Sequence, residues 1–207
     1  MTDGRVTVAR LAEAKGLPVE ALRRFGLSDV DEGVRFAYVA PGGAPGRTRL
    51  RTGMRGAGGS AWVPGDVHPV VAYCSADGLD HARSAGYQIV VEGESDCWTA
   101  WHHGLPAVGI PGSDHWDALA PEHLPVGEVF VQVEADNAQT YPDGVAGYVA
   151  AVVRRIRILG FTGRVHELKL GDGISDLSDL YGSDPDGFTA AVSQALDRSR
   201  LAGQETP

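Results

Sequence analysis

The sequence contains little lysine and no long apolar run. Lysine occurs only as Lys15 and Lys169, so nearly all positive charge is arginine, whose guanidinium group can bind a phosphate through two hydrogen bonds. No stretch approaches the roughly 18 consecutive apolar residues of a membrane span. The N-terminus also lacks the charged and hydrophobic segments of a secretory signal. We therefore expect a cytoplasmic protein without a membrane partner.

Cysteine is scarce as well, because only Cys74 and Cys97 occur. They are too few for a disulfide framework or a four-cysteine zinc site, and their apolar surroundings predict buried thiols. His102 and His103 lie close to Cys97 in the sequence, but adjacent histidines point to different faces of a helix. The spacing also fits no zinc pattern, so a site for a soft metal is not favoured.

The charges are segregated along the chain. The 207 residues are 43% hydrophobic and 22% charged, as in an ordinary globular protein, and the net charge of −9 argues at first against binding a polyanion. Residues 46–64, however, contain no acid, whereas acids concentrate in residues 92–143 and 172–186. The basic segment carries four arginines, namely Arg47, Arg49, Arg51 and Arg55. This local excess predicts a nucleic-acid-binding surface, with a solvated hairpin as the alternative.

The first part of the chain predicts a small α+β subdomain. One short helix is expected to end at Gly16, and a second to open with Pro18 and close at Gly26. Strand-like segments at residues 35–39, 48–52 and 61–63 then predict an antiparallel sheet. Because side chains two apart on a strand share a face, Arg47, Arg49 and Arg51 should point the same way.

From about residue 76 the pattern is one of strands alternating with helices, which predicts a Rossmann-like parallel sheet with flanking helices. The expected strands are residues 88–91, 107–110, 128–133 and 164–170, and the expected helices are residues 96–103, 144–159 and 186–200. We therefore divide the chain into a basic subdomain at residues 1–75, an α/β domain at residues 76–200 and a disordered tail at residues 201–207.

Acids follow two of these strands directly. Glu92 ends one apolar run, and Glu134 and Asp136 follow another. Ligands bind beyond the carboxyl ends of parallel strands, and carboxylates brought together there repel one another unless a cation binds them. Oxygen ligands of this kind suit Mg²⁺ or Mn²⁺. The alternative is that these acids only cap turns or helix N-termini.

A further acidic segment, residues 171–180, follows the last predicted strand and contains Asp172, Asp176 and Asp179. These acids could also cap a helix and stabilise its first turn through the helix dipole. Asp176 is the better candidate for the site.

Four segments together resemble the Toprim domain of bacterial and phage-type DNA primases and primase-helicases. They are Val-Val-Glu-Gly-Glu-Ser-Asp at residues 90–96, Gly-Leu-Pro-Ala-Val-Gly-Ile-Pro-Gly at 104–112, Val-Phe-Val-Gln-Val-Glu-Ala-Asp at 129–136 and Ser-Asp-Leu-Ser-Asp-Leu at 175–180. The resemblance covers about residues 86 to 181, and the arginine-rich segment resembles, more weakly, the basic subdomain that precedes Toprim in primases.

The resemblance implies roles for individual residues. Glu92 takes the place of the catalytic glutamate, a general acid or base. Asp96 takes that of the aspartate at the start of the next helix and is the second residue expected to be catalytic. Glu134 and Asp136 take the place of the metal-binding pair, with Asp176 as a later acid. The sequence departs from the family at Glu134, where aspartate is usual, and at Ser175, where lysine is common.

The function implied is magnesium-dependent synthesis of RNA primers from nucleoside triphosphates on a single-stranded DNA template. A replicative helicase is a candidate partner. Two alternatives stay open: a Toprim nuclease that cleaves phosphodiesters, and a non-catalytic nucleic-acid-binding module of a larger replication protein.

Overall fold

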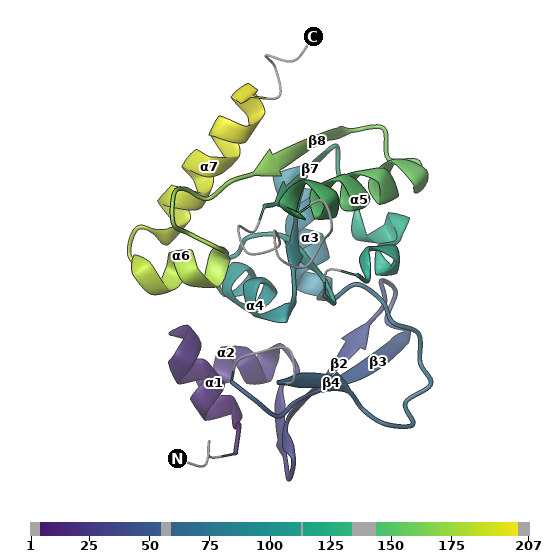
Figure 1. Cartoon of the computed structure of the whole chain (residues 1–207), viewed down its shortest axis with the longest axis vertical. Coiled ribbons are helices and arrows are strands. Elements are labelled where there is room, and N and C mark those ends of the chain that lie inside the picture. Colours follow the sequence, from purple (N-terminus) through teal and green to yellow (C-terminus); the bar gives the residue numbers. More distant parts are fainter. Residues whose placement is uncertain (1–4, 55–58, 113, 134–143, 203–207) are drawn as a thin grey trace. The chain divides into compact units, whose positions relative to one another are not determined.

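The chain divides between Val71 and Ala72 into two units, each with its own four-stranded sheet (Figure 1). The computed structural model describes residues 5–54, 59–112, 114–133 and 144–202. None of the helices in these ranges is long and apolar enough to cross a lipid bilayer. The tail predicted to be disordered lies almost wholly outside the described residues.

The first unit opens with the two expected helices, α1 (Val8–Lys15) and α2 (Val19–Arg24). Thr7 caps α1, because its hydroxyl oxygen accepts a hydrogen bond from the backbone N–H of Arg10 at 3.2 Å. Gly16 ends α1 in the left-handed conformation, at a φ of 64°. Leu11 and Leu22 are buried, so the helices turn their apolar sides inward.

The sheet of this unit is antiparallel and consists of β1 (Ser28–Val30), β2 (Gly33–Val39), β3 (Pro45–Arg51) and β4 (Ser60–Trp62), in that order. The short β1 was not predicted. Along β2 the side chains alternate: Val34, Phe36 and Tyr38 are fully buried, whereas the residues between them are exposed. One face of the sheet is therefore part of the core of this unit.

The second unit is built on a parallel sheet in the order β6-β5-β7-β8. Its strands are β5 (Tyr87–Glu92), β6 (Ala107–Ile110), β7 (Glu128–Gln132) and β8 (Arg164–Leu168). All four were predicted, with ends that differ by at most two residues. Sheets of this kind are covered on both faces, which explains the continuous apolar runs in the sequence.

Helices cover both faces of the parallel sheet (Figure 1). They are α3 (Ala76–Ala85), α4 (Glu94–His102), α5 (Gly144–Ile158), α6 (Leu177–Ser183) and α7 (Phe188–Ala202). Tyr148 and Val152 of α5 belong to one buried cluster with Val129 and Val131 of β7. Phe130 points to the opposite face, where the guanidinium of Arg200 in α7 lies 5.1 Å from its ring centre.

Helix α4 is anchored by two buried tryptophans. The indole N–H of Trp98 donates to the hydroxyl of Tyr73 at 3.0 Å, and that of Trp101 donates to the carbonyl of Ala107 at 2.9 Å. The two cysteines are buried, as predicted. Burial raises the pKa of the Cys74 thiol to about 11 and that of Cys97 well above its ordinary value, so neither has the character of a reactive thiolate.

The outer side of β6 is closed by a short antiparallel bridge between Tyr73 and Gly109. Each of these residues donates its backbone N–H to the carbonyl of the other at 2.8 Å. Gly109 also lets the start of α4 approach, because a Cβ atom there would lie 2.6 Å from the carbonyl oxygen of Gly93 and 2.9 Å from the sulfur of Cys97. Any larger residue at this position would push α4 away from the sheet.

Candidate active site and nucleic-acid interface

Glu92 is the last residue of β5 and is half-buried. Gly93 follows it with a φ of 83°, a left-handed backbone conformation that glycine adopts readily. The chain can therefore turn from the strand directly into α4, which begins at Glu94. This strand-turn-helix arrangement places Glu92 at the carboxyl edge of the sheet, where parallel α/β folds bind their ligands.

Strand β7 lies next to β5 and runs in the same direction, with Val131 paired to Val90. Glu92 is two residues beyond Val90, and Glu134 is three residues beyond Val131. The segment that carries Glu134 and Asp136 thus starts from the same edge as Glu92. Both acids lie outside the described residues, so their predicted role in metal binding stays a prediction.

Asp96 connects three elements at this edge. It is 1% exposed and lies in the first turn of α4. One carboxylate oxygen accepts hydrogen bonds from the backbone N–H and the hydroxyl of Ser178, both at 2.9 Å. The other accepts from the side-chain amide of Gln132, at the end of β7, at 3.3 Å. These contacts make Asp96 a residue that positions α6 and β7, and its predicted catalytic role is untested.

Asp176 is the N-cap of α6, and its carboxylate accepts the backbone N–H of Asp179 at 2.7 Å. Asp176 therefore does cap a helix, which is the alternative role expected for the acids of this segment. Asp172 and Asp179 are exposed. Ser178 of α6 is hydrogen-bonded to Asp96, which also binds Gln132. The N-terminus of α6 therefore lies near the carboxyl end of β7 and the start of α4.

The donor chemistry of this edge suits a hard divalent cation, because Glu92 and Asp176 offer carboxylate oxygens. Within residues 5–54, 59–112, 114–133 and 144–202, however, no three His, Cys, Asp or Glu side chains are grouped closely enough to hold a metal ion. The other predicted ligands, Glu134 and Asp136, lie outside these ranges, so the magnesium site stays a prediction. His103 packs against the rings of Tyr181 and Phe188, at 4.6 and 4.7 Å between ring centres.

Two of the predicted nucleic-acid-binding residues, Arg47 and Arg49, lie on the same face of β3, as expected from strand alternation. The guanidinium carbons lie 5.9 and 4.6 Å, respectively, from the ring centre of Trp62 in β4. Arg49 is paired with both Phe36 and Trp62. The arginines therefore share a face with the buried residues of β2.

Arg51 continues this row, paired with Val34 of β2, and its guanidinium donates to the carbonyl of Met54 at 3.1 Å. Arg47, Arg49 and Arg51 are all half-buried, unlike the side chains of a freely solvated hairpin. Arg55 lies outside the described residues.

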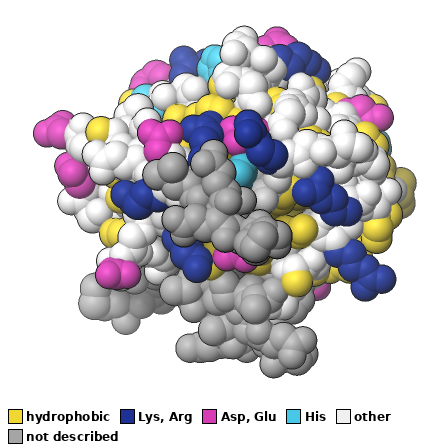
Figure 2. Space-filling view, turned by 90° about the horizontal axis from the view of Figure 1, so that it is seen from above, with side chains coloured by type: hydrophobic (Ala, Val, Ile, Leu, Met, Phe, Trp, Pro, Cys, Tyr) yellow, Lys and Arg dark blue, Asp and Glu magenta, His cyan; other side chains and the backbone are white. Residues whose placement is uncertain are grey.

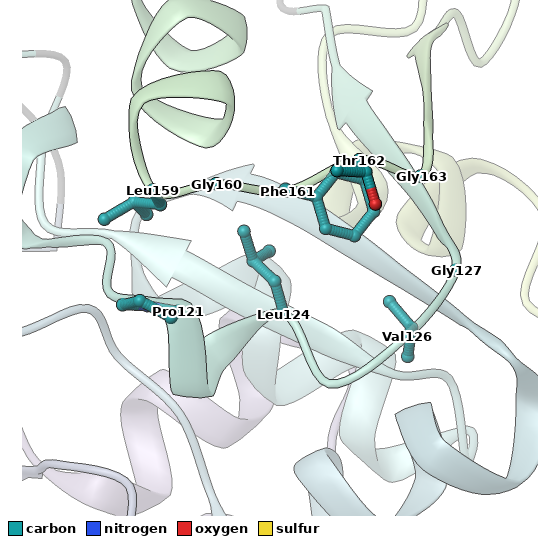
Figure 3. Close-up of a pocket in the computed structure, with 9 residues that line it drawn as sticks. All are labelled: Pro121, Leu124, Val126, Gly127, Leu159, Gly160, Phe161, Thr162 and Gly163. Carbon is teal, nitrogen blue, oxygen red and sulfur yellow. The ribbon is translucent and has the colours of Figure 1, made fainter.

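A pocket of about 310 Å³ lies at the opposite end of the parallel sheet, where β7 and β8 begin (Figure 3). It is lined by Pro121, Leu124, Val126, Gly127, Leu159, Gly160, Phe161, Thr162 and Gly163. These residues include no titratable side chain, and the pocket is far along the strands from Glu92. It is therefore no candidate for the acid-dependent chemistry.

Figure 2 shows one face of the molecule, on which the described Lys and Arg side chains are interspersed with Asp and Glu. A phosphate-binding surface is expected to carry charge of one sign. This face does not match that expectation.

No protein-family model and no curated protein matches the sequence. A DnaG catalytic core superposes with a TM-score of 0.60 at 18% identity, over 90% of this chain and 71% of that one. The DnaG primase catalytic domain bound to ssDNA gives 0.59 at 18% identity, over 91% and 71%. The Escherichia coli primase catalytic core gives 0.57 at 17% identity, over 90% and 74%.

The chain has the fold of the primase catalytic core. The predicted fold class, a Toprim-like parallel sheet with a small α+β part before it, is confirmed. The resemblance of residues 86 to 181 to the Toprim domain is likewise confirmed as a resemblance of fold.

Sequence reasoning missed three residues of this primase-core fold that the structure singles out: Gln132, Ser178 and Trp62. A signal existed for Gln132, the one polar residue between the apolar residues 129–131 and Val133. Trp62 is the only aromatic residue among the arginines of residues 46–64. Ser178 carried no signal of its own, since its contact is with a residue far away in the sequence.

Proposed function

We propose that the protein is a primase-like nucleotidyltransferase that joins ribonucleotides on a single-stranded DNA template. The observation that carries this proposal is the place of Glu92, which ends β5 beside the carboxyl end of β7, from which Glu134 and Asp136 follow. In a parallel sheet this is the edge at which substrates bind. Acids gathered there are suited to phosphoryl transfer through bound cations.

Each residue of this edge has a task in the proposal. Glu92 would accept the proton of the attacking hydroxyl as a general base. Asp96 would hold the start of α6, and with it Asp176, in place relative to β7. A Mg²⁺ or Mn²⁺ ion bound by Glu134, Asp136 and Asp176 would neutralise the charge of the nucleoside triphosphate.

The arginines of β3 would bind the phosphates of the template strand, a task to which planar guanidinium groups are suited. This requires no base-specific contact, because a primer is copied from many sequences and phosphate contacts carry no sequence information. A replicative helicase remains a candidate partner.

Two alternatives use the same residues differently. A Toprim nuclease would employ the acids to hydrolyse a phosphodiester. A non-catalytic module would only bind nucleic acid, and the departures at Glu134 and Ser175 from the family pattern favour this alternative. Incorporation of labelled ribonucleotide on single-stranded DNA, with nicking measured in the same samples, separates the three.

We expect metal-dependent incorporation in the native protein and a loss of about a hundred- to ten-thousand-fold in Glu92→Gln, the usual range for general acid–base groups. Glu122→Gln is the matched control, because Glu122 is exposed and precedes β7, at the end of the sheet opposite to Glu92. Binding of DNA without incorporation or nicking would leave the non-catalytic module. Activity of Glu92→Gln within about threefold of the native protein would show that Glu92 is not the general base, because so small a loss is far below that range.

A further inference from the structure

Trp62 of β4 is in contact with two arginines of β3. The guanidinium carbon of Arg49 lies 4.6 Å from the centre of the indole ring, and that of Arg47 lies 5.9 Å from it. Both distances are within the range of about 6 Å over which a cation is attracted to an aromatic face. Because Arg49 and Trp62 are directly paired in the sheet, this contact is built into the register of the strands.

Each of these guanidinium groups is held at a second point through Nε. Nε of Arg47 donates to the backbone carbonyl of Asp66 at 3.0 Å, and Nε of Arg49 donates to the hydroxyl of Ser60 at 2.8 Å. Nε is the nitrogen nearest the aliphatic stem, so a hydrogen bond there combined with contact to the ring fixes the plane of the group. A guanidinium that is already oriented loses less rotamer freedom when it binds a phosphate.

Asp66, whose backbone carbonyl binds Arg47, uses its carboxylate within its own loop. The Asp66 carboxylate accepts the backbone N–H of Thr48 at 2.8 Å and both the backbone N–H and Nδ1 of His68, at 3.0 and 2.7 Å. These hydrogen bonds, that from the His68 backbone first, hold the pKa of Asp66 well below its usual range. The loop that offers its carbonyl to Arg47 is thereby fixed, and Arg47 meets the Asp66 backbone rather than the carboxylate.

The indole ring is itself anchored in the core of the unit. Trp62 is half-buried, and its ring meets that of the fully buried Tyr38 edge-on, at 5.1 Å between centres and an angle of 66°. Such edge-to-face pairs have a preferred geometry. Tyr38, Trp62 and the two arginines thus form a continuous series of contacts that leads outward from the core.

We infer that Trp62 is a positioning residue that holds Arg47 and Arg49 as a preorganised pair for two phosphates of one nucleic-acid strand. The inference rests on the proposed function, in which these arginines bind the template. It assigns to Trp62 a role in phosphate geometry, not in stacking on the bases.

The test is the salt dependence of binding to a labelled oligo(dT), measured by fluorescence anisotropy. Replacing both arginines, as in Arg47→Ala with Arg49→Ala, should lower the log–log salt slope by about 1.4, at about 0.7 for each phosphate contact to a single strand. Trp62→Leu should instead weaken binding by about three- to tenfold at a nearly native slope, because both charges remain but the guanidinium groups are no longer held in place. Trp62→Phe, which keeps an aromatic face, should restore most of the affinity.

A combined variant isolates the coupling between ring and arginines. If Trp62 acts only through Arg47 and Arg49, then Trp62→Leu added to the double alanine variant should change nothing further. Arg47→Lys with Arg49→Lys provides a second route if Trp62→Leu does not fold, because lysine keeps the charge but cannot stack as a plane. This variant should keep the slope near native and lose affinity, as Trp62→Leu does. Circular dichroism and melting curves establish that each protein compared is folded.

The possible outcomes distinguish a failure of the inference about Trp62 from a failure of the proposed template binding by the arginines. A loss of affinity on Trp62→Leu that persists in the double alanine background would show base stacking by Trp62 and overturn the inference. Native affinity in both Trp62→Leu and the lysine variant would overturn it too, while leaving the arginines as the binding surface. Native binding by the double alanine variant would instead remove the proposed interface itself.

Discussion

The carboxylate of Asp96 accepts both the backbone N–H and the hydroxyl of Ser178, although the two residues are 82 positions apart. These hydrogen bonds join the first turn of α4 to the first turn of α6. Both residues are buried, so the polar groups that meet here have no water to replace a lost partner. This carboxylate therefore helps to fix the relative position of two helices at the candidate site, together with the Thr99 hydroxyl, which lies 3.3 Å from that of Ser178.

Asp96→Ala should lower the free energy of unfolding by about 2–4 kcal/mol, since it leaves buried donors without their charged acceptor. Urea denaturation followed by circular dichroism measures this. Asp179→Ala, at an exposed position on α6 next to Ser178, serves as the control and should stay within about 0.5 kcal/mol of the native protein. An Asp96→Ala protein of native stability but without activity would instead support the catalytic role predicted from the sequence.

Mg²⁺ should raise the melting temperature of the native protein, because a ligand that binds only the folded state stabilises it, by about 2.7 kcal/mol at a hundred times its Kd. The double variant Glu134→Gln with Asp136→Asn should lose this shift and keep its melting temperature without metal. Differential scanning calorimetry at several Mg²⁺ concentrations provides the measurement. Equal shifts in both proteins would place the metal elsewhere.

Glu128 at the start of β7 is a buried acid that contacts two arginines and a histidine. Its carboxylate accepts from Arg200 of α7 and from His166 of β8, both at 3.0 Å, and lies 3.4 Å from Nε of Arg164. Glu128→Gln should destabilise the protein by about 1.5–3 kcal/mol, the range for a hydrogen bond to a charged group. Hydrogen exchange should show the greatest loss of protection in α7.

The control for that experiment is Arg164→Ala. The side chain of Arg164 is 74% exposed, and a surface ion pair contributes about 0–1 kcal/mol. A larger effect of Arg164→Ala than of Glu128→Gln would contradict the assignment of Arg200 and His166 as the partners that matter.

Stability should decline as the pH falls below 6.5, the ordinary pKa of histidine. Burial, followed by the nearby charge of His102, lowers the pKa of His103 in the folded protein. The unfolded chain therefore binds more protons than the folded one in the window below 6.5, so the stability present above that pH is lost as the pH falls through the lowered pKa.

His103→Phe should make stability less dependent on pH in that window, since the ring contacts with Tyr181 and Phe188 are kept while the titrating group is removed. Urea denaturation at several pH values between about 5 and 8 covers the range in which histidine titrates. His81→Phe, at an exposed position, is the comparison. A steeper dependence in His103→Phe than in the native protein would contradict this origin of the effect.

The strands of the parallel sheet could be predicted because each is a short apolar run closed by a polar residue or a turn. Helix α3 could not, since only Gly78, Leu79 and Ala82 of its ten residues are buried and the periodic signal is weak. Glu92 could be assigned to the site because the end of a parallel strand fixes its place. The contact of Asp96 with Ser178, and that of Trp62 with Arg47, depend on tertiary packing and strand register, which local patterns do not encode.

The bridge between Tyr73 and Gly109 has a consequence for solubility. Strand β6 is at the end of the sheet and is apolar throughout, and an exposed edge of this kind can pair with another chain and aggregate. Both backbone polar groups of Gly109 bind Tyr73, so the segment just ahead of α3 occupies the edge. A fragment that starts at Ala76 would bare this edge and self-associate, whereas one that starts at Ala72 would keep it covered. The residues that lead into the parallel sheet thus protect the protein from its own most aggregation-prone strand.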